Sequence, residues 1–215
     1  MAACIKLRKL EHILEMIDDF GYPKINLEQY STPSHIAAQA LYSIQTKFGD
    51  MQGKDVLDLG CGPGILSIGA ALLGAKHVLG VDIDSNALEI FECNCEGIEL
   101  DNISSLEADV LKLPENLPKH SFDTVILNPP FGTKQNNGID VAFLKVATEM
   151  SRGAIYSMHK TTTRQYIKKK GKEWKVPGLV LAQLRFNLPK IYHFHRAESK
   201  DIAVDLWRFE VPKQD

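Results

Sequence analysis

The sequence predicts an α/β fold, with a mostly parallel sheet that carries helices on both of its faces. Between residues 56 and 158, short apolar runs alternate with helical stretches, and this alternation is typical of a parallel sheet. Two longer strand-like runs, residues 179–188 and 202–211, then follow with little helix between them. They predict an antiparallel pair at one edge, which brings the expected sheet to seven strands.

The predicted elements follow one another without a linker, a repeat or a low-complexity tract. Strands are predicted at residues 56–59, 77–83, 103–110, 122–127, 154–158, 179–188 and 202–211. Helices are predicted between the parallel strands at residues 65–73, 86–99 and 141–151. A chain of 215 residues is long enough to bury one core, so we predict a single domain over residues 1–215.

The N-terminal segment, residues 1–50, is predicted to be helical. Apolar residues recur at helical spacing over about the first 15 residues, until a Gly-Tyr-Pro sequence interrupts the pattern. A second helix is predicted at residues 34–48, with Ser31 or Thr32 as its N-cap and a proline in its first turn.

Composition excludes several classes of protein. The formal net charge is −2, whereas a protein that coats nucleic acid is usually far more basic, so any RNA binding must use a local patch or a partner. The four cysteines form no Cys-x-x-Cys pair, which favours reduced thiols in an intracellular protein and argues against a zinc site. We expect neither a signal peptide nor a membrane span, because no sufficiently long apolar run is present.

The first motif is a glycine loop, Asp-Leu-Gly-Cys-Gly-Pro-Gly at residues 58–64, between a predicted strand and a predicted helix. Glycines there let the backbone turn sharply and approach a ligand. The third glycine comes one residue early for a nicotinamide-binding loop, and the Gly-Lys-Ser/Thr of a P-loop is absent. The order of residues in this loop resembles the first motif of class I methyltransferases, which use S-adenosylmethionine. A glycine-rich turn that binds no ligand is the alternative interpretation.

Two further acidic residues suit such a cofactor, which has no phosphates that a lysine or a helix N-terminus would have to neutralise. Asp82 ends the next predicted strand, roughly 20 residues after the loop, where a carboxylate can accept hydrogen bonds from a ribose diol. Asp109 follows the third strand and can reach the amine of an adenine ring. The Val110 backbone can contact the same ring.

The second motif, Asn128-Pro129-Pro130-Phe131, follows the fourth predicted strand and is the most specific signal in the chain. Two consecutive prolines stiffen the backbone, so that a carbonyl can be held facing outward. The Asn128 side-chain oxygen and the Pro129 carbonyl can then accept both hydrogens of one NH₂ group. Phe131 offers a flat face on which a base can stack.

This arrangement suits methylation of a planar exocyclic nitrogen. The lone pair of an aromatic amine is delocalised into the ring, and two acceptors that hold its hydrogens favour a more tetrahedral, more nucleophilic nitrogen. Catalysis then consists of alignment and of stabilising the developing positive charge, and requires no strong base. A proline-stiffened loop without a catalytic role is the alternative, which the glycine loop earlier in the chain disfavours.

The sequence resembles class I methyltransferases with an Asn-Pro-Pro-aromatic motif, which act on adenine N6 in DNA or RNA or on glutamine N5 in release factors. Within them it is similar, over essentially the whole chain, to the eukaryotic enzymes that methylate an adenine N6 of small-subunit (18S) ribosomal RNA. The resemblance is carried by residues 28–33, 58–62, 123–134 and 156–160.

The resemblance implies a Rossmann-like methyltransferase fold with S-adenosyl-L-methionine as the cofactor, to which the segment 1–50 contributes. It implies that the following residues contact the cofactor: Gln29, Thr32, Gly60, Gly62, Pro63, Ile65, Asp82, Asp109 and Val110. For Pro63, the resemblance implies only a contact through the backbone. It further implies a heterodimer with a small zinc-binding activator protein that pairs with a sheet edge, and a location in the nucleus, including the nucleolus, and in the cytoplasm.

A lysine-rich stretch at residues 160–175, with Lys190 and residues 193–196 beyond it, predicts contacts with RNA phosphates. A solvated helix face is the alternative. Two other functions stay open at this point, a glutamine-N5 protein methyltransferase and a non-catalytic subunit that retains the cofactor fold. The first usually has a larger N-terminal helical domain, and the intact Asn-Pro-Pro-Phe motif argues against the second.

Overall fold

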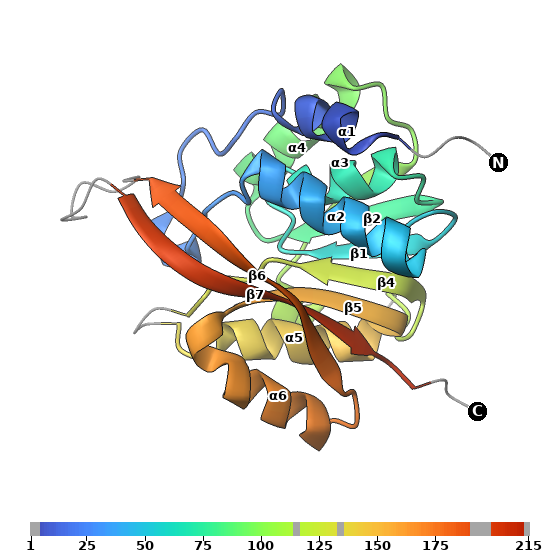
Figure 1. The fold of residues 1–215 in the computed structure, drawn as a ribbon. Helices are drawn as coiled ribbons and strands as arrows, with labels where there is room; N and C mark the ends of the chain where they lie inside the picture. Colours follow the sequence, from blue (N-terminus) through green and yellow to red (C-terminus); the bar gives the residue numbers. More distant parts are fainter. Residues whose placement is uncertain (1–4, 114–116, 133–135, 190–198, 213–215) are drawn as a thin grey trace.

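The computed structural model describes residues 5–113, 117–132, 136–189 and 199–212. Its centre is a seven-stranded sheet with the strand order β3-β2-β1-β4-β5-β7-β6 (Figure 1). The first five strands of this order are parallel to one another, whereas β7 is antiparallel to both β5 and β6. The predicted mostly parallel sheet with an antiparallel C-terminal edge is therefore confirmed.

The elements alternate along the chain as the apolar pattern predicts. The strands are β1 (Asp55–Leu59), β2 (His77–Asp82), β3 (Ile103–Glu107), β4 (Phe122–Leu127), β5 (Ser151–Lys160), β6 (Gly178–Pro189) and β7 (Ser199–Glu210). The α-helices are α1 (Leu7–Leu14), α2 (Ser34–Phe48), α3 (Ile65–Leu72), α4 (Ser85–Gly97), α5 (Ile139–Met150) and α6 (Arg164–Glu173). Three short 3₁₀ helices are η1 (Ile25–Leu27), η2 (Val110–Lys112) and η3 (Thr161–Thr163).

Helices cover both faces of the sheet, so successive side chains of β1 enter different cores (Figure 1). Val56 packs with α1 to α4, whereas Leu57 and Leu59 pack with α5 and α6 on the other face. A smaller cluster joins α2 to the antiparallel strands through Ile36 and Phe186. A strand buried on both faces reads as a continuous apolar run, which explains why the sequence pattern located these strands well.

Some predicted details are wrong. Neither Ser31 nor Thr32 caps α2, because Pro33 is the N-cap residue and the Thr32 hydroxyl accepts a hydrogen bond from Asn128 instead. Helix α1 ends at Leu14, which agrees with the prediction of about 15 residues, whereas the third strand ends at Glu107 rather than at 110. The chain leaves that strand early because it turns into η2.

None of the described helices is long and apolar enough to cross a membrane. Within the same described residues, His, Cys, Asp and Glu form no group that could hold a metal ion. Cys61 and Cys95 are buried thiols and Cys93 is exposed. Cys4 lies outside the described residues.

Candidate functional site

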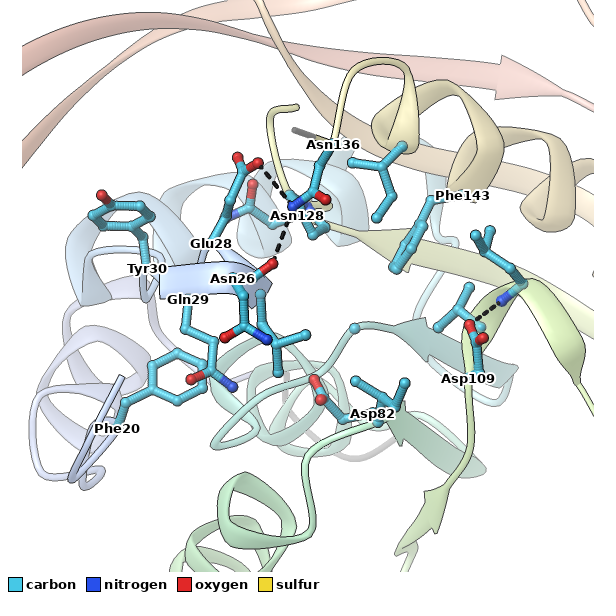
Figure 2. Close-up of a pocket in the computed structure, with 17 residues that line it drawn as sticks. Phe20, Asn26, Glu28, Gln29, Tyr30, Asp82, Asp109, Asn128, Asn136 and Phe143 are labelled. Atoms are coloured by element: carbon cyan, nitrogen blue, oxygen red, sulfur yellow. Dashed lines mark hydrogen bonds between the residues drawn. The ribbon is translucent and has the colours of Figure 1, made fainter. Parts of the chain in front are cut away.

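A cavity of about 210 Å³ opens beyond the carboxyl ends of the parallel strands, where the glycine loop and the Asn-Pro-Pro-Phe segment meet (Figure 2). Ligands of open α/β sheets bind at this edge. The described residues that line it are Phe20, Asn26, Leu27, Glu28, Gln29, Tyr30, Gly60, Asp82, Ile83, Asp109, Val110, Leu111, Asn128, Pro130, Asn136, Ile139 and Phe143.

The glycine loop passes under the cavity between β1 and α3. The Gly60 amide donates to the Val81 carbonyl at 2.8 Å, and this bond ties the loop to the end of β2. Gly60 has a φ of +76°, and a Cβ there would lie 3.2 Å from the ring of Phe143 across the cavity. A side chain at this position would therefore strain the backbone and crowd the cavity, so glycine is required.

Asp82 lies at the end of β2 and lines the cavity. Its two carboxylate oxygens accept backbone hydrogen bonds at 2.9 Å, one from Gly62 and one from Asp84. Burial raises the pKa of Asp82, and these two hydrogen bonds offset only part of that effect. The carboxylate thus fixes the loop and still has lone pairs free to accept from a diol.

Asp58, at the first position of the glycine motif, lies beneath the loop and is almost completely buried. Its Oδ2 accepts a hydrogen bond of 2.6 Å from the Ser67 hydroxyl, while its Oδ1 has no hydrogen-bond partner in the described part of the chain. Burial raises the pKa of Asp58 to about 7, and the nearby Asp82 raises it further against the lowering effect of Ser67. This acid shapes the charge of the site although it does not line the cavity.

On the β3 side, Asp109 and Val110 line the cavity as the sequence predicts. Asp109 is the N-cap of η2, where its Oδ1 accepts from the Leu111 amide at 2.9 Å. The apolar side chains of Ile83 and Leu111 lie exposed beside it. This part of the cavity therefore combines an acidic acceptor with apolar surface, which suits a flat heterocycle with an amine.

Asn128 projects from the end of β4 into the opposite side of the cavity (Figure 2). Its Nδ2 donates to the Thr32 hydroxyl at 2.9 Å, which fixes the orientation of the amide. Its Oδ1 is buried and has no hydrogen-bond partner among the described residues. An unsatisfied buried acceptor costs free energy, so it indicates a site prepared for an external N–H donor.

Phe131 leaves the cavity wall and packs toward β6 instead. Its ring centroid lies 6.3 Å from that of Phe186, and the Lys160 ammonium lies 5.7 Å above the Phe131 ring. The same ammonium is 3.4 Å from the Phe131 carbonyl oxygen. These contacts hold the end of the Asn-Pro-Pro-Phe segment against β5.

The predicted site residues divide into two groups. The first group lines the cavity and consists of Gln29, Gly60, Asp82, Asp109, Val110, Asn128 and Pro130. The second group lies just outside the lining and consists of Thr32, Gly62, Pro63, Ile65, Pro129 and Phe131. Pro63 directs its carbonyl to Asn94, which donates to it at 3.0 Å, and Thr32 supports Asn128.

Several residues of the cavity carry no signal in the sequence. Phe143 and Ile139 come from α5, where an apolar residue at helical spacing is indistinguishable from one that only packs in the core. Asn136 is a polar loop residue whose amide bridges to the N-terminal segment (Figure 2). Only the tertiary structure brings these residues to the site.

The predicted RNA-contact stretch forms the end of β5, η3 and α6. Part of its charge is already paired, since Arg164 binds Asp205 at 2.6 Å and Lys170 binds Glu173 at 2.8 Å. Three lysines on the surface are exposed and have no ion pair within the described residues, namely Lys168, Lys172 and Lys175. Lys190 and residues 193–196 lie outside the described residues.

The chain is related to proteins of known classes. A family model of ribosomal protein L11 methyltransferases (PrmA) matches residues 34–129, from α2 through the glycine loop to the Asn-Pro segment. The chain is 51% identical over 209 residues to the rRNA N(6)-adenosine-methyltransferase Mettl5 of Drosophila melanogaster, which covers 97% of this chain and 98% of that protein. It is 42% identical over 208 residues to metl-5 of Caenorhabditis elegans, named as the same activity, covering 94% and 97%.

A solved structure agrees with these relatives. The protein comes from Pyrococcus horikoshii and is described as a candidate RNA methyltransferase. It is 34% identical to this chain, with a TM-score of 0.82, over 97% of this chain and 99% of the other. Sequence and fold are therefore shared over nearly the full length of each protein.

Proposed function

This chain belongs to the Mettl5 family of rRNA N6-adenosine methyltransferases, and we propose that it methylates the N6 amine of an adenosine in small-subunit (18S) ribosomal RNA with S-adenosylmethionine as the methyl donor. The observation that carries the proposal is the buried, unpartnered Oδ1 of Asn128 at the cavity. It offers an acceptor where the motif requires one for the target amine.

The charge of the cavity supports S-adenosylmethionine as the donor. Glu28, Asp82 and Asp109 line the cavity, whereas the described lining residues include no lysine or arginine. Such a cavity suits a ligand with cationic groups and no phosphates, and S-adenosylmethionine carries a sulfonium and an ammonium. Asp82 would bind the ribose hydroxyls, and Asp109 with the Val110 backbone would bind the adenine. Gly60 leaves the space that a side chain would fill.

The remaining chemistry belongs to the Asn-Pro-Pro-Phe segment. Asn128 Oδ1 and the Pro129 carbonyl accept the two N–H groups of the target amine and orient its lone pair. When bound, S-adenosylmethionine supplies an electrophilic methyl group. Transfer forms an N–C bond and breaks an S–C bond, and the amine then loses one proton to solvent. Thr32 keeps the Asn128 amide from rotating, because its hydroxyl accepts from Nδ2.

Binding of the substrate strand is proposed at the same edge of the sheet. The target base, flipped out of its strand, would displace the Lys160 ammonium from above the Phe131 ring and stack there. The exposed lysines of residues 168–175 extend this surface along α6 and would hold phosphates. Their contribution predicts RNA affinity that falls as salt concentration rises.

We further propose the assembly and location that the resemblance implies. The chain pairs a sheet edge with a small zinc-binding activator protein, and it acts in the nucleus, including the nucleolus, and in the cytoplasm. Co-purification of a zinc-containing partner, followed by loss of activity when that partner is removed, tests the assembly. Imaging of the tagged chain tests its location. A chain that is fully active and stable alone would contradict the requirement for a partner.

The activity is tested with labelled S-adenosylmethionine and small-subunit ribosomal RNA, using the full chain together with the activator. Mass spectrometry of the digested nucleosides identifies the product, which we expect to be N6-methyladenosine. Asn128→Ala should lower the rate of product formation about 10²-fold, whereas Asn137→Ala, an exposed asparagine of the same loop, should leave it unchanged. No RNA product from a chain that binds the cofactor would instead favour a glutamine substrate in a protein.

A further inference from the structure

The N-terminal wall of the cavity, residues 24–30, is held in place by polar contacts. We call this segment the strap. Its residues 26–30 line the cavity, and η1 within it contains no buried residue. Its last residue, Tyr30, packs against the small cluster that joins α2 to the antiparallel strands, and polar contacts at two sides hold the rest of the strap. On one side, Asn136 donates to the Asn26 carbonyl at 3.0 Å (Figure 2).

On the other side, the strap is bound to Asp84, which follows β2. The Lys24 ammonium is 2.6 Å from Asp84 Oδ1, and the Gln29 amide donates to Asp84 Oδ2 at 2.7 Å. The Gln29 side-chain oxygen accepts from the Lys24 backbone amide at 2.6 Å, which closes the strap into a loop. Both ends of the Gln29 amide are thus engaged within the protein, although the residue lines the cavity.

Asp84 can hold the strap in place because burial and hydrogen bonds fix its own position. Its side chain is only 3% exposed, and it caps α4 by accepting from the Asn86 amide. Its backbone amide donates to Asp82 Oδ1 at 2.9 Å, so the same residue touches the carboxylate proposed to bind the ribose. The strap and the floor of the cavity therefore share one anchor.

We propose that Asp84 is a positioning residue for cofactor binding, which uses Lys24 and Gln29 to fix the strap over the cavity that also contains Asp82. The proposal rests on the proposed use of S-adenosylmethionine. Asp84 does not act on the methyl group or on the target amine, so its effect should be on cofactor affinity rather than on the rate of transfer. Burial raises the pKa of Asp84, but hydrogen bonds from Lys24, Gln29 and Asn86 outweigh it and hold the pKa below its ordinary value, which fits a carboxylate kept charged for the strap.

The sharpest variant is Asp84→Asn. Asparagine caps a helix as well as aspartate does, so α4 keeps its cap. To keep that cap, the asparagine oxygen must face Asn86 and Lys24, so its NH₂ group faces the Gln29 donor and that hydrogen bond is lost. Loss of charge-assisted hydrogen bonds predicts a dissociation constant for S-adenosylmethionine about tenfold higher, with kcat at saturating cofactor within about twofold of wild type.

Lys24→Met tests the same anchor from the strap, and Lys76→Met is its matched control. Lys76 pairs with Asp55 at 3.4 Å at the start of β1, the end of the strand away from the cavity. We expect weaker cofactor binding for Lys24→Met and unchanged binding for Lys76→Met, by calorimetry with S-adenosylmethionine on the full chain. The effects of Lys24→Met and Asp84→Asn should add to less than their sum in the double variant, because both weaken the Lys24–Asp84 ion pair.

Hydrogen–deuterium exchange separates this proposal from the proposed function. In the chain without cofactor, both variants should speed exchange of the amides of residues 25–31 and leave that of β1 and β4 unchanged. If wild type does not bind S-adenosylmethionine, the proposed function fails, and exchange still tests the anchor. Unchanged exchange in the strap, unchanged affinity, or a fall in kcat with no change in affinity would each overturn the role given to Asp84.

Discussion

The two walls of the cavity are built in different ways. The sheet wall carries Asp82 and Asn128 at the ends of β2 and β4, with the buried Asp58 beneath it. The strap wall consists of a short 3₁₀ turn without a buried residue and the residues on either side of it, which Asp84 and Asn136 hold in place. We infer that side chains on buried strands are held more rigidly than those on a strap fixed by polar contacts. We expect substitutions in the sheet wall to affect stability and the rate of transfer, and those in the strap to affect affinity.

The largest effect is expected from the buried charge in the sheet wall. Burial raises the pKa of Asp58 from the ordinary 3.8 to about 7. Between these two pH values the folded chain keeps a proton on Asp58 that the unfolded chain has lost. Stability therefore falls as the pH rises through this window, by about 4 kcal/mol in total, and levels off above it. Asp58→Asn should remove this slope in urea unfolding measured at a series of pH values. An unchanged slope would show that Asp58 is ionised throughout.

The next effect concerns the acceptor itself. Asn128→Ala removes the unpartnered Oδ1, and removal of one preorganised group at a reacting centre costs about 3 kcal/mol, or about 10²-fold in kcat. The rate of N6-methyladenosine formation at saturating cofactor measures it, with the exposed Asn137→Ala as the control. The dissociation constant for the cofactor should change little. A change confined to that constant would place Asn128 in cofactor binding instead.

A smaller effect is expected for the carboxylate that joins the glycine loop to β2. Asp82→Asn keeps one acceptor and turns an NH₂ group toward the amide of Gly62 or Asp84. We expect a loss of about 2 kcal/mol in the free energy of unfolding, because a charged acceptor is lost from a buried hydrogen bond. Cofactor binding should weaken as well. Chemical denaturation and calorimetry measure the two effects, and the exposed Asp101→Asn is the control.

The smallest effect is expected at the second side of the strap. Asn136→Ala removes the hydrogen bonds to the Asn26 carbonyl and to the Glu28 carboxylate. Partly exposed hydrogen bonds contribute about 1 kcal/mol, so the dissociation constant for the cofactor should rise about fivefold. The kcat value should stay near that of wild type. A fall in kcat as large as that of Asn128→Ala would show that the strap wall affects the rate of transfer as much as the sheet wall does.

The sequence was informative where a residue type is forced by local geometry. Gly60 at a positive φ, Asp82 at the end of a strand and the two prolines after Asn128 all follow from short-range rules, and their positions were predicted. Sequence rules failed where two uses of a residue compete. Thr32 precedes a helix and looks like a cap, yet its hydroxyl accepts from Asn128. Only the fold shows which partner is present.

By itself, the sequence determined the alternating fold, the edge of the sheet at which the cavity opens and the two motifs that meet there, because apolar period and turn chemistry are local properties. The tertiary structure decided which residues complete the cavity. Phe143 from α5, Asn136 from a loop and Asp84 beneath the strap come together through packing between segments distant in sequence. Such contacts leave no periodic pattern in the sequence, because each depends on a hydrogen bond or a surface that forms only when the chain has folded.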